Sequence, residues 1–158
     1  MIKILILDVD GVMTDGSIIY DNAGREYKKF NVRDGFGIRL LKKMNVEVII
    51  ISGRTSSITT IRAKELGIDR VYQGVNDKLE LYEELKIKHA WNDAEVAFIG
   101  DDVNDVELML KVGLSAATND SFDYVKNNAN IVTPVDGGKG AVRYFIDYII
   151  NKNKKWKD

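Results

Sequence analysis

Three short apolar runs constrain the fold of this 158-residue chain more than any other feature. They are rich in isoleucine and valine, show little alternation with polar residues, and cover residues 2–7, 46–51 and 96–99. Runs of this kind are typical of strands that are buried on both faces of a parallel sheet. Segments with helical periodicity separate and follow them, at residues 33–44, 56–66, 79–89, 103–111 and 141–150.

This alternation of strands and helices predicts an α/β fold: a doubly wound, Rossmann-like, mostly parallel sheet flanked by helices. Weaker strands at residues 70–72, 114–116 and 130–132 extend the sheet. The length fits one domain, and no internal repeat or linker interrupts it, so we expect a single domain over residues 1–158. The lysine-rich residues 152–158 are expected to form a flexible, solvated tail.

One segment departs from this pattern directly after the first strand. Residues 17–20 and 26–30 flank the turn-forming sequence Asp-Asn-Ala-Gly at positions 21–24, which predicts a projecting β-hairpin over about residues 17–30. Its aromatic side chains would be a liability on an exposed strand edge, and pairing with other copies of the hairpin would cover them. Packing of the hairpin on its own domain explains the sequence equally well.

The composition excludes several classes of function. Cysteine is absent, which excludes disulfides, thiolate metal sites and cysteine nucleophiles and suits a reducing compartment, so we expect a cytoplasmic protein. Lysine and arginine total 23 against 24 acids, a net charge of −1, and no long-range field favours a nucleic acid or a membrane as partner. Asp8 interrupts the opening apolar run well short of the length of a signal or spanning segment.

Two carboxylates, Asp8 and Asp10, follow the first predicted strand. Strand geometry places both on one side and Val9 on the other. Unpaired, they would repel each other and raise each other's pKa, and a cation between them relieves that repulsion. Mg²⁺ prefers oxygen ligands of this type. Alone the motif is weak, because an ordinary Asp-Gly turn explains it as well.

Further polar motifs follow the later strands. Ser52-Gly53-Arg54 ends the second strand, where a hydroxyl and free N–H groups suit phosphoryl oxygens. Lys78 begins the helix after the third strand. An acidic cluster ends the fourth strand: Asp101, Asp102 and Asp105. Because the carboxyl ends of parallel strands meet at one edge of a sheet, these motifs are predicted to converge in one crevice, which outweighs the capping role that each could have alone.

The four motifs, in this order and with Thr14-Asp15 after the first, resemble the haloacid dehalogenase superfamily of phosphatases. The resemblance implies that Asp8 is the nucleophile and that Asp10 protonates the leaving alcohol and then activates water. It implies that Ser52 and Lys78 hold the phosphoryl group. It also implies that Mg²⁺ is bound by Asp8, the backbone oxygen of Asp10 and Asp101, while Asp102 and Asp105 support these groups or orient Lys78.

The spacing of the motifs leaves no room for a cap domain. Between Asp10 and Ser52 lie 41 residues, which the hairpin and one helix occupy, and between Lys78 and Asp101 lie 22, which one helix occupies. An open site excludes water poorly and offers a free substrate few contacts. The substrate is therefore macromolecular, or a neighbouring subunit supplies the lid.

Nearly the whole chain is similar to the capless 3-deoxy-D-manno-octulosonate 8-phosphate phosphatases, including the sequence Gly-Gly-Lys-Gly-Ala-Val-Arg at residues 137–143. This resemblance implies a homotetramer assembled through its hairpins, and a small phosphorylated keto-acid sugar of lipopolysaccharide biosynthesis as substrate. It implies substrate contacts by Asn31, Val32, Arg33, Asp34, Gly35, Arg39, Arg54, Arg62 and Lys78. Tyr144 departs from the family, which usually has Glu at that position.

Three alternatives remain open. Phosphatases of nine-carbon ulosonate 9-phosphates share the fold and the hairpin but tend to vary at the position of Arg54, whose retention favours the eight-carbon substrate. A signalling receiver domain also uses Mg²⁺ and a phosphorylated aspartate, but it places the acid pair and the phosphorylated residue on different strands. A non-catalytic oligomerisation domain is the third alternative, and the complete set of motifs argues against it.

Overall fold

Six parallel strands form the centre of the protein. This computed structural model describes residues 1–153. The strand order is β5-β4-β1-β6-β7-β8, and every pairing in this sheet is parallel. The strands are β1 (Ile4–Leu7), β4 (Glu47–Ile51), β5 (Arg70–Tyr72), β6 (Val96–Gly100), β7 (Leu114–Ala117) and β8 (Ile131–Val132). The predicted doubly wound α/β fold is confirmed.

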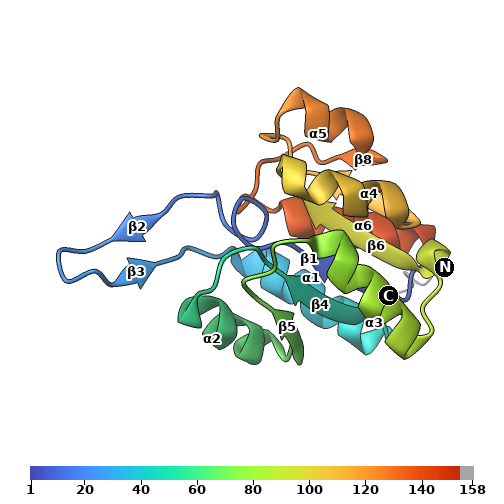
Figure 1. Cartoon of the computed structure of the whole chain (residues 1–158), viewed down its shortest axis with the longest axis horizontal. Helices are drawn as coiled ribbons and strands as arrows, with labels where there is room; N and C mark the ends of the chain where they lie inside the picture. Colours follow the sequence, from blue (N-terminus) through green and yellow to red (C-terminus); the bar gives the residue numbers. More distant parts are fainter. Residues whose placement is uncertain (154–158) are drawn as a thin grey trace.

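Helices cover both faces of the sheet (Figure 1). Apolar side chains of α1, α2 and α6 pack on one face, and those of α3, α4 and α5 pack on the other. The helices are α1 (Val32–Lys43), α2 (Ser57–Leu66), α3 (Lys78–His89), α4 (Val106–Lys111), α5 (Asp123–Asn128) and α6 (Ala141–Lys152). Two 3₁₀ turns, η1 (Asp93–Glu95) and η2 (Val103–Asp105), precede β6 and α4.

The apolar runs are explained by burial on both sides of the sheet. In β1, Leu5 and Leu7 contribute to one core cluster, and Ile4 and Ile6 contribute to the other. Successive side chains of a strand point to opposite faces, so a strand between two helical layers needs an apolar residue at every position. All four side chains are buried.

The predicted hairpin is present after β1, with shorter strands than expected. β2 (Ile19–Tyr20) and β3 (Glu26–Tyr27) form a separate antiparallel pair that projects from the body of the protein (Figure 1). Asp21 accepts hydrogen bonds from the backbone N–H groups of Ala23 and Arg25 and fixes the turn. Apolar side chains on its first arm are exposed, including Ile18, Ile19 and Tyr20.

The remaining connections are short. Between Asp10 and Ser52 the chain forms the hairpin, α1 and β4, and between Lys78 and Asp101 it forms α3, η1 and β6, so no cap domain is inserted at either place. The six-residue helix α5 and the turn η1 were not predicted from the sequence.

Most of the predicted tail, residues 154–158, lies outside the described residues. Among residues 1–153, no helix combines the length and apolar character needed to cross a membrane.

The strand order determines where a ligand can bind. From β1 the chain passes to β4 and β5 on one side, and then returns to β6, β7 and β8 on the other. The connections on the two sides of β1 therefore diverge, and a crevice opens beyond the carboxyl ends of β4, β1 and β6.

Candidate active site

A cavity of about 210 Å³ lies at the carboxyl ends of the central strands. Asp8 and Asp10 follow β1, Ser52 follows β4, and Asp101 follows β6, while Lys78 is the first residue of α3. The side chains of all four sequence motifs thus line one space. Its lining residues are Asp8, Asp10, Ser52, Gly53, Arg54, Lys78, Asp101, Asp102 and Asn104.

Lys78 connects the acids of the first and fourth motifs. Its ammonium lies 2.9 Å from Oδ1 of Asp8 and 2.6 Å from Oδ1 of Asp105, and its side chain is only 1% exposed. Burial alone would lower the pKa of Lys78, but the two carboxylates outweigh burial and raise its pKa above the ordinary value. Lys78 therefore remains a cation beneath the cavity.

Asp105 supports the site from below. It is fully buried, and its Oδ2 accepts hydrogen bonds from the backbone N–H groups of Asp101, at 2.9 Å, and Asp102, at 3.2 Å. With Oδ1 on Lys78, its carboxylate fixes both the loop after β6 and the lysine. Asp102 caps η2 through the N–H of Val103 and lines the rim of the cavity.

The acids around the cavity have the properties of a cation site. Burial raises the pKa of Asp8 to about 6, although Lys78 opposes this shift. Burial, followed by the charge of Asp8, raises the pKa of Asp101 to about 9. One oxygen each of Asp8, Asp101 and Asp105 lies within 4.8 Å of the others. Carboxylates this close together repel each other when ionised, and a bound divalent cation would relieve that repulsion. The set of oxygen donors therefore fits Mg²⁺.

Gly11 allows the carboxylate of Asp101 to approach the loop after β1. Its φ is +88°, a left-handed conformation that favours glycine, and a Cβ atom at this position would lie 2.0 Å from Oδ2 of Asp101. The Asp-Gly sequence that could have been an ordinary turn thus brings two acidic segments together.

Ser52 is held beneath the cavity by the backbone. Its N–H donates to the carbonyl of Tyr72, and its carbonyl accepts from Val75, so the residue is joined to the segment after β5. Ser52 is only 2% exposed, and Gly53 follows it along the cavity wall. A hydroxyl and free backbone N–H groups at this place can hold the oxygens of a phosphoryl group.

Two hairpin residues that the sequence did not identify, Glu26 and Lys28, contact side chains that line the cavity. Lys28 donates to Oδ1 of Asp10 and lies 3.2 Å from Oε1 of Glu26. Nη1 of Arg54 lies 3.0 Å from the same Glu26 oxygen and 3.6 Å from Oδ1 of Asp10. The pattern of charges in residues 25–29 gave no signal for these contacts, because they depend on how the hairpin leaves the sheet.

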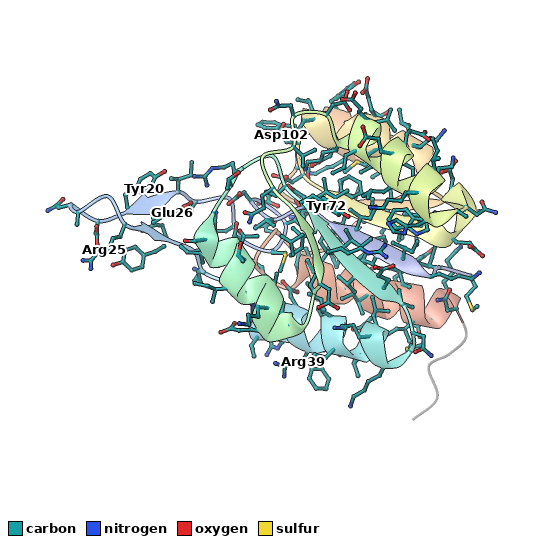
Figure 2. The ribbon with its side chains drawn as sticks, turned by 60° about the horizontal axis from the view of Figure 1, so that its bottom comes forward. Tyr20, Arg25, Glu26, Arg39, Tyr72 and Asp102 are labelled. Atoms are coloured by element: carbon teal, nitrogen blue, oxygen red, sulfur yellow. The ribbon has the colours of Figure 1, made fainter. Side chains whose placement is uncertain are left out.

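Several residues predicted to bind substrate do not line this cavity. Arg39 and Arg62 line a separate pocket of about 110 Å³ between α1 and α2. Figure 2 shows Arg39 on α1, on the other side of the molecule from Asp102 at the cavity rim. Val32 and Gly35 also line this second pocket, together with Phe36 and Leu66. Within one chain, only Arg54 and Lys78 of the predicted substrate contacts lie at the Asp8 cavity.

Asn31 and Asp34 make capping hydrogen bonds at two helix starts. Asn31 caps α1 by accepting the N–H of Arg33, whose own side chain is on the surface. Oδ1 of Asp34 accepts the N–H of Arg143 in the first turn of α6, a helix whose N-cap residue is a glycine. Burial raises the pKa of Asp34 to about 6, although this hydrogen bond opposes the shift.

Comparisons with known proteins agree with this geometry. The sequence profile of the haloacid dehalogenase-like hydrolases matches residues 68–146. The chain is 47% identical over 149 residues to the 3-deoxy-D-manno-octulosonate 8-phosphate phosphatase of Yersinia pestis, covering 94% of this chain and 80% of that protein. The chain belongs to the 3-deoxy-D-manno-octulosonate 8-phosphate phosphatase family.

Solved structures of this phosphatase family share the fold. The Yersinia pestis enzyme superposes with a TM-score of 0.94 at 46% identity, covering 98% of this chain and 83% of that one. The enzyme from Moraxella catarrhalis superposes with a TM-score of 0.92 at 37% identity, covering 95% and 86%, and its crystals contain magnesium, phosphate and the KDO molecule. The chain is therefore a phosphatase of the haloacid dehalogenase type, and Mg²⁺ is its cofactor.

The raised carboxyl pKa values predict that Mg²⁺ stabilises the protein more strongly at high pH. The unfolded chain ionises these carboxyls more readily, so the metal-free fold loses stability as the pH rises through about 6 for Asp8 and about 9 for Asp101. Mg²⁺ binds the ionised forms and reverses this loss. We expect a larger Mg²⁺-induced rise in melting temperature near pH ~9 than near pH ~6.

Two variants make this measurement specific. Asp101→Asn should lose most of the Mg²⁺-induced rise, whereas the surface variant Asp123→Asn on α5 should keep it. An equal rise at both pH values, or an unchanged rise in Asp101→Asn, would contradict the assignment of this cluster as the metal site.

Proposed function

We propose that this chain hydrolyses 3-deoxy-D-manno-octulosonate 8-phosphate to 3-deoxy-D-manno-octulosonate and inorganic phosphate. The observation that carries the proposal is the single cavity lined by Asp8, Lys78 and Asp101, in a chain nearly half identical to phosphatases named for this reaction. The absence of cysteine supports a cytoplasmic location for the enzyme. The product is a keto-acid sugar of lipopolysaccharide.

In the first step, a carboxylate oxygen of Asp8 attacks the phosphorus atom. The bond between phosphorus and the leaving oxygen breaks, and Asp10 donates its proton to that oxygen, so the alcohol leaves neutral. Ser52 and Lys78 hold the phosphoryl oxygens, a role that their positions beneath the cavity support. The result is an aspartyl phosphate on Asp8.

In the second step, Asp10 takes a proton from water, and the water oxygen attacks the phosphorus atom. The bond from phosphorus to Asp8 breaks, which restores the Asp8 carboxylate and releases phosphate. Asp8, the backbone oxygen of Asp10 and Asp101 would hold Mg²⁺. When bound, the ion supplies positive charge that lets an anionic carboxylate approach an anionic phosphate.

We assign the choice of substrate to Arg54 within this cavity. Its guanidinium lies at the rim, 3.0 Å from Glu26, and a planar guanidinium suits the carboxylate of a keto-acid sugar. Arg39 and Arg62 lie in a separate pocket of the same chain and would reach a substrate only from a neighbouring subunit. The proposed homotetramer would supply that neighbour.

A panel of phosphate esters tests the substrate assignment. We expect the highest kcat/KM with the eight-carbon ulosonate 8-phosphate, a lower value with a nine-carbon ulosonate 9-phosphate, and the lowest with hexose 6-phosphates. Arg54→Lys keeps the charge but loses the planar fork, and should reduce kcat/KM for the keto-acid substrate by roughly tenfold or more. The reduction should be much smaller with hexose phosphates.

Arg70→Ala serves as the matched control, because Arg70 lies at the amino end of β5 and pairs with Glu47. A preference for hexose phosphates would overturn the proposed role of Arg54. A preference for the nine-carbon ester would replace the substrate assignment while leaving the phosphatase chemistry intact.

The hairpin is proposed as the element that assembles the tetramer. Ile18, Ile19 and Tyr20 are about half exposed in the isolated chain, and exposed apolar strand edges are sites of association. We expect the triple variant Ile18→Ser, Ile19→Lys, Tyr20→Ser to sediment as a smaller species than the parent protein. Ile87→Lys, at an exposed position on α3, should not change the oligomeric state. An unchanged sedimentation coefficient in the triple variant would reject the hairpin as the assembly element.

A further inference from the structure

The base of the hairpin carries a buried lysine whose position is unusual for this residue. The side chain of Lys28 is 1% exposed, whereas that of the adjacent Lys29 is 69% exposed. Lysine is almost never fully buried unless it is paired. The burial follows from strand geometry, because Glu26 and Lys28 point to one side of β3 and its extension, while Tyr27 and Lys29 point to solvent.

One partner of Lys28, Asp10, lines the catalytic cavity, and the other, Glu26, contacts Arg54, which also lines it. The ammonium of Lys28 donates to Oδ1 of Asp10 and lies 3.2 Å from Oε1 of Glu26. Arg54 completes the cluster, with Nη1 3.0 Å from the same oxygen of Glu26. The cluster thus joins the loop after β1, the hairpin and the loop after β4. Figure 2 shows Glu26 on the hairpin arm, which leaves the sheet beside the loops at its carboxyl edge.

This arrangement bears on proton transfer by Asp10. A carboxylate that serves as acid and then as base must keep one oxygen within hydrogen-bonding reach of the leaving oxygen and of the attacking water. Lys28 binds Oδ1 of Asp10, so the rotation of the carboxyl group is restricted and Oδ2 remains available. Arg54 forms a longer ion pair with the same Oδ1 atom, at 3.6 Å, so in this structure Lys28 makes the direct hydrogen bond to it.

We propose that Lys28 is a positioning residue for the reaction: it holds the Asp10 carboxyl group in the orientation needed for proton transfer, and Glu26 holds Lys28. This inference rests on the proposed function, in which Asp10 donates and accepts the proton. The hairpin consequently contributes to catalysis inside its own subunit, in addition to its proposed role in assembly.

Pre-steady-state kinetics of Lys28→Met test the proposal with two leaving groups. A sugar alkoxide needs a proton from Asp10, whereas p-nitrophenolate leaves without one. With the sugar phosphate, the first turnover of Lys28→Met should be slower than that of the parent enzyme by roughly 10- to 100-fold, part of the usual contribution of general acid catalysis. With p-nitrophenyl phosphate, the burst of p-nitrophenol should keep its rate within about threefold.

The second step should be slowed equally for both substrates, because the aspartyl phosphate is common to them and its hydrolysis needs Asp10 as base. The Mg²⁺ dependence should change little, since Lys28 contacts the side chain of Asp10 and not the backbone oxygen proposed to hold the ion. Lys29→Met is the matched control and should behave like the parent enzyme, because Lys29 is exposed and lies 4.0 Å from Asp15.

Lys28→Gln is a second variant that tests the proposal if Lys28→Met does not fold properly. It keeps a hydrogen-bond donor and loses the charge, so its first turnover with the sugar phosphate should fall between those of the parent and of Lys28→Met. Melting temperature and sedimentation should match the parent in Lys28→Met and Lys28→Gln.

The outcomes separate the inference from the proposed function. If the parent enzyme gives a burst and Lys28→Met loses the same factor with both leaving groups, the loss is not specific to proton transfer and the positioning role is overturned. Unchanged kinetics in Lys28→Met and Lys28→Gln also overturn it. If the parent enzyme itself forms no phosphoenzyme, the proposed function fails, and the role of Lys28 fails with it.

Discussion

The ion pairs of Lys78 with Asp8 and Asp105 are the contact on which the rest of the site depends. Three acids meet at the carboxyl edge of a sheet whose strands are buried on both faces, where unpaired charges are costly. Lys78 neutralises part of this charge, and Asp105 uses its second oxygen to fix the backbone of Asp101. Burial keeps the pKa of Asp8 and of Asp101 high, with smaller contributions from the charge of Asp105 on Asp8 and of Asp8 on Asp101. A cation between the two carboxylates would offset this cost, which makes the pair a ligand set for Mg²⁺.

The sequence was informative wherever one strand or helix determined the result. Apolar runs with little alternation predicted β1, β4 and β6, because a strand between two helical layers has no solvent-facing side. The convergence of the motif residues followed from their positions at strand ends, because parallel strands align their carboxyl ends at one edge of the sheet. Helix α5 was not predicted, because six residues with a single buried side chain, Val125, show too little of the hydrophobic periodicity of a helix.

The sequence was less informative wherever a contact joins segments that are far apart. Lys28 lies in a run of charges that resembles a solvated strand, and only the path of the hairpin brings it to Asp10. Arg39 and Arg62 were grouped with Arg54 by family resemblance, yet one chain places them in another pocket. A single sequence does not indicate which subunit presents a side chain to a site. In the proposed tetramer, Arg39 and Arg62 of one subunit would reach the substrate of a neighbouring subunit. The hairpin would then lie both at the contact between subunits and beside Asp10 of its own subunit.

Trapping of the phosphoenzyme is the most direct test of the central claim, that Asp8 forms a covalent bond to the phosphoryl group. The enzyme would be mixed with substrate and Mg²⁺, quenched in acid during turnover, digested and examined by mass spectrometry. The account predicts a phosphoryl group on Asp8 in the peptide that contains it, and none in Asp8→Asn. A phosphoryl group on another residue, or undiminished turnover by Asp8→Asn, would contradict it.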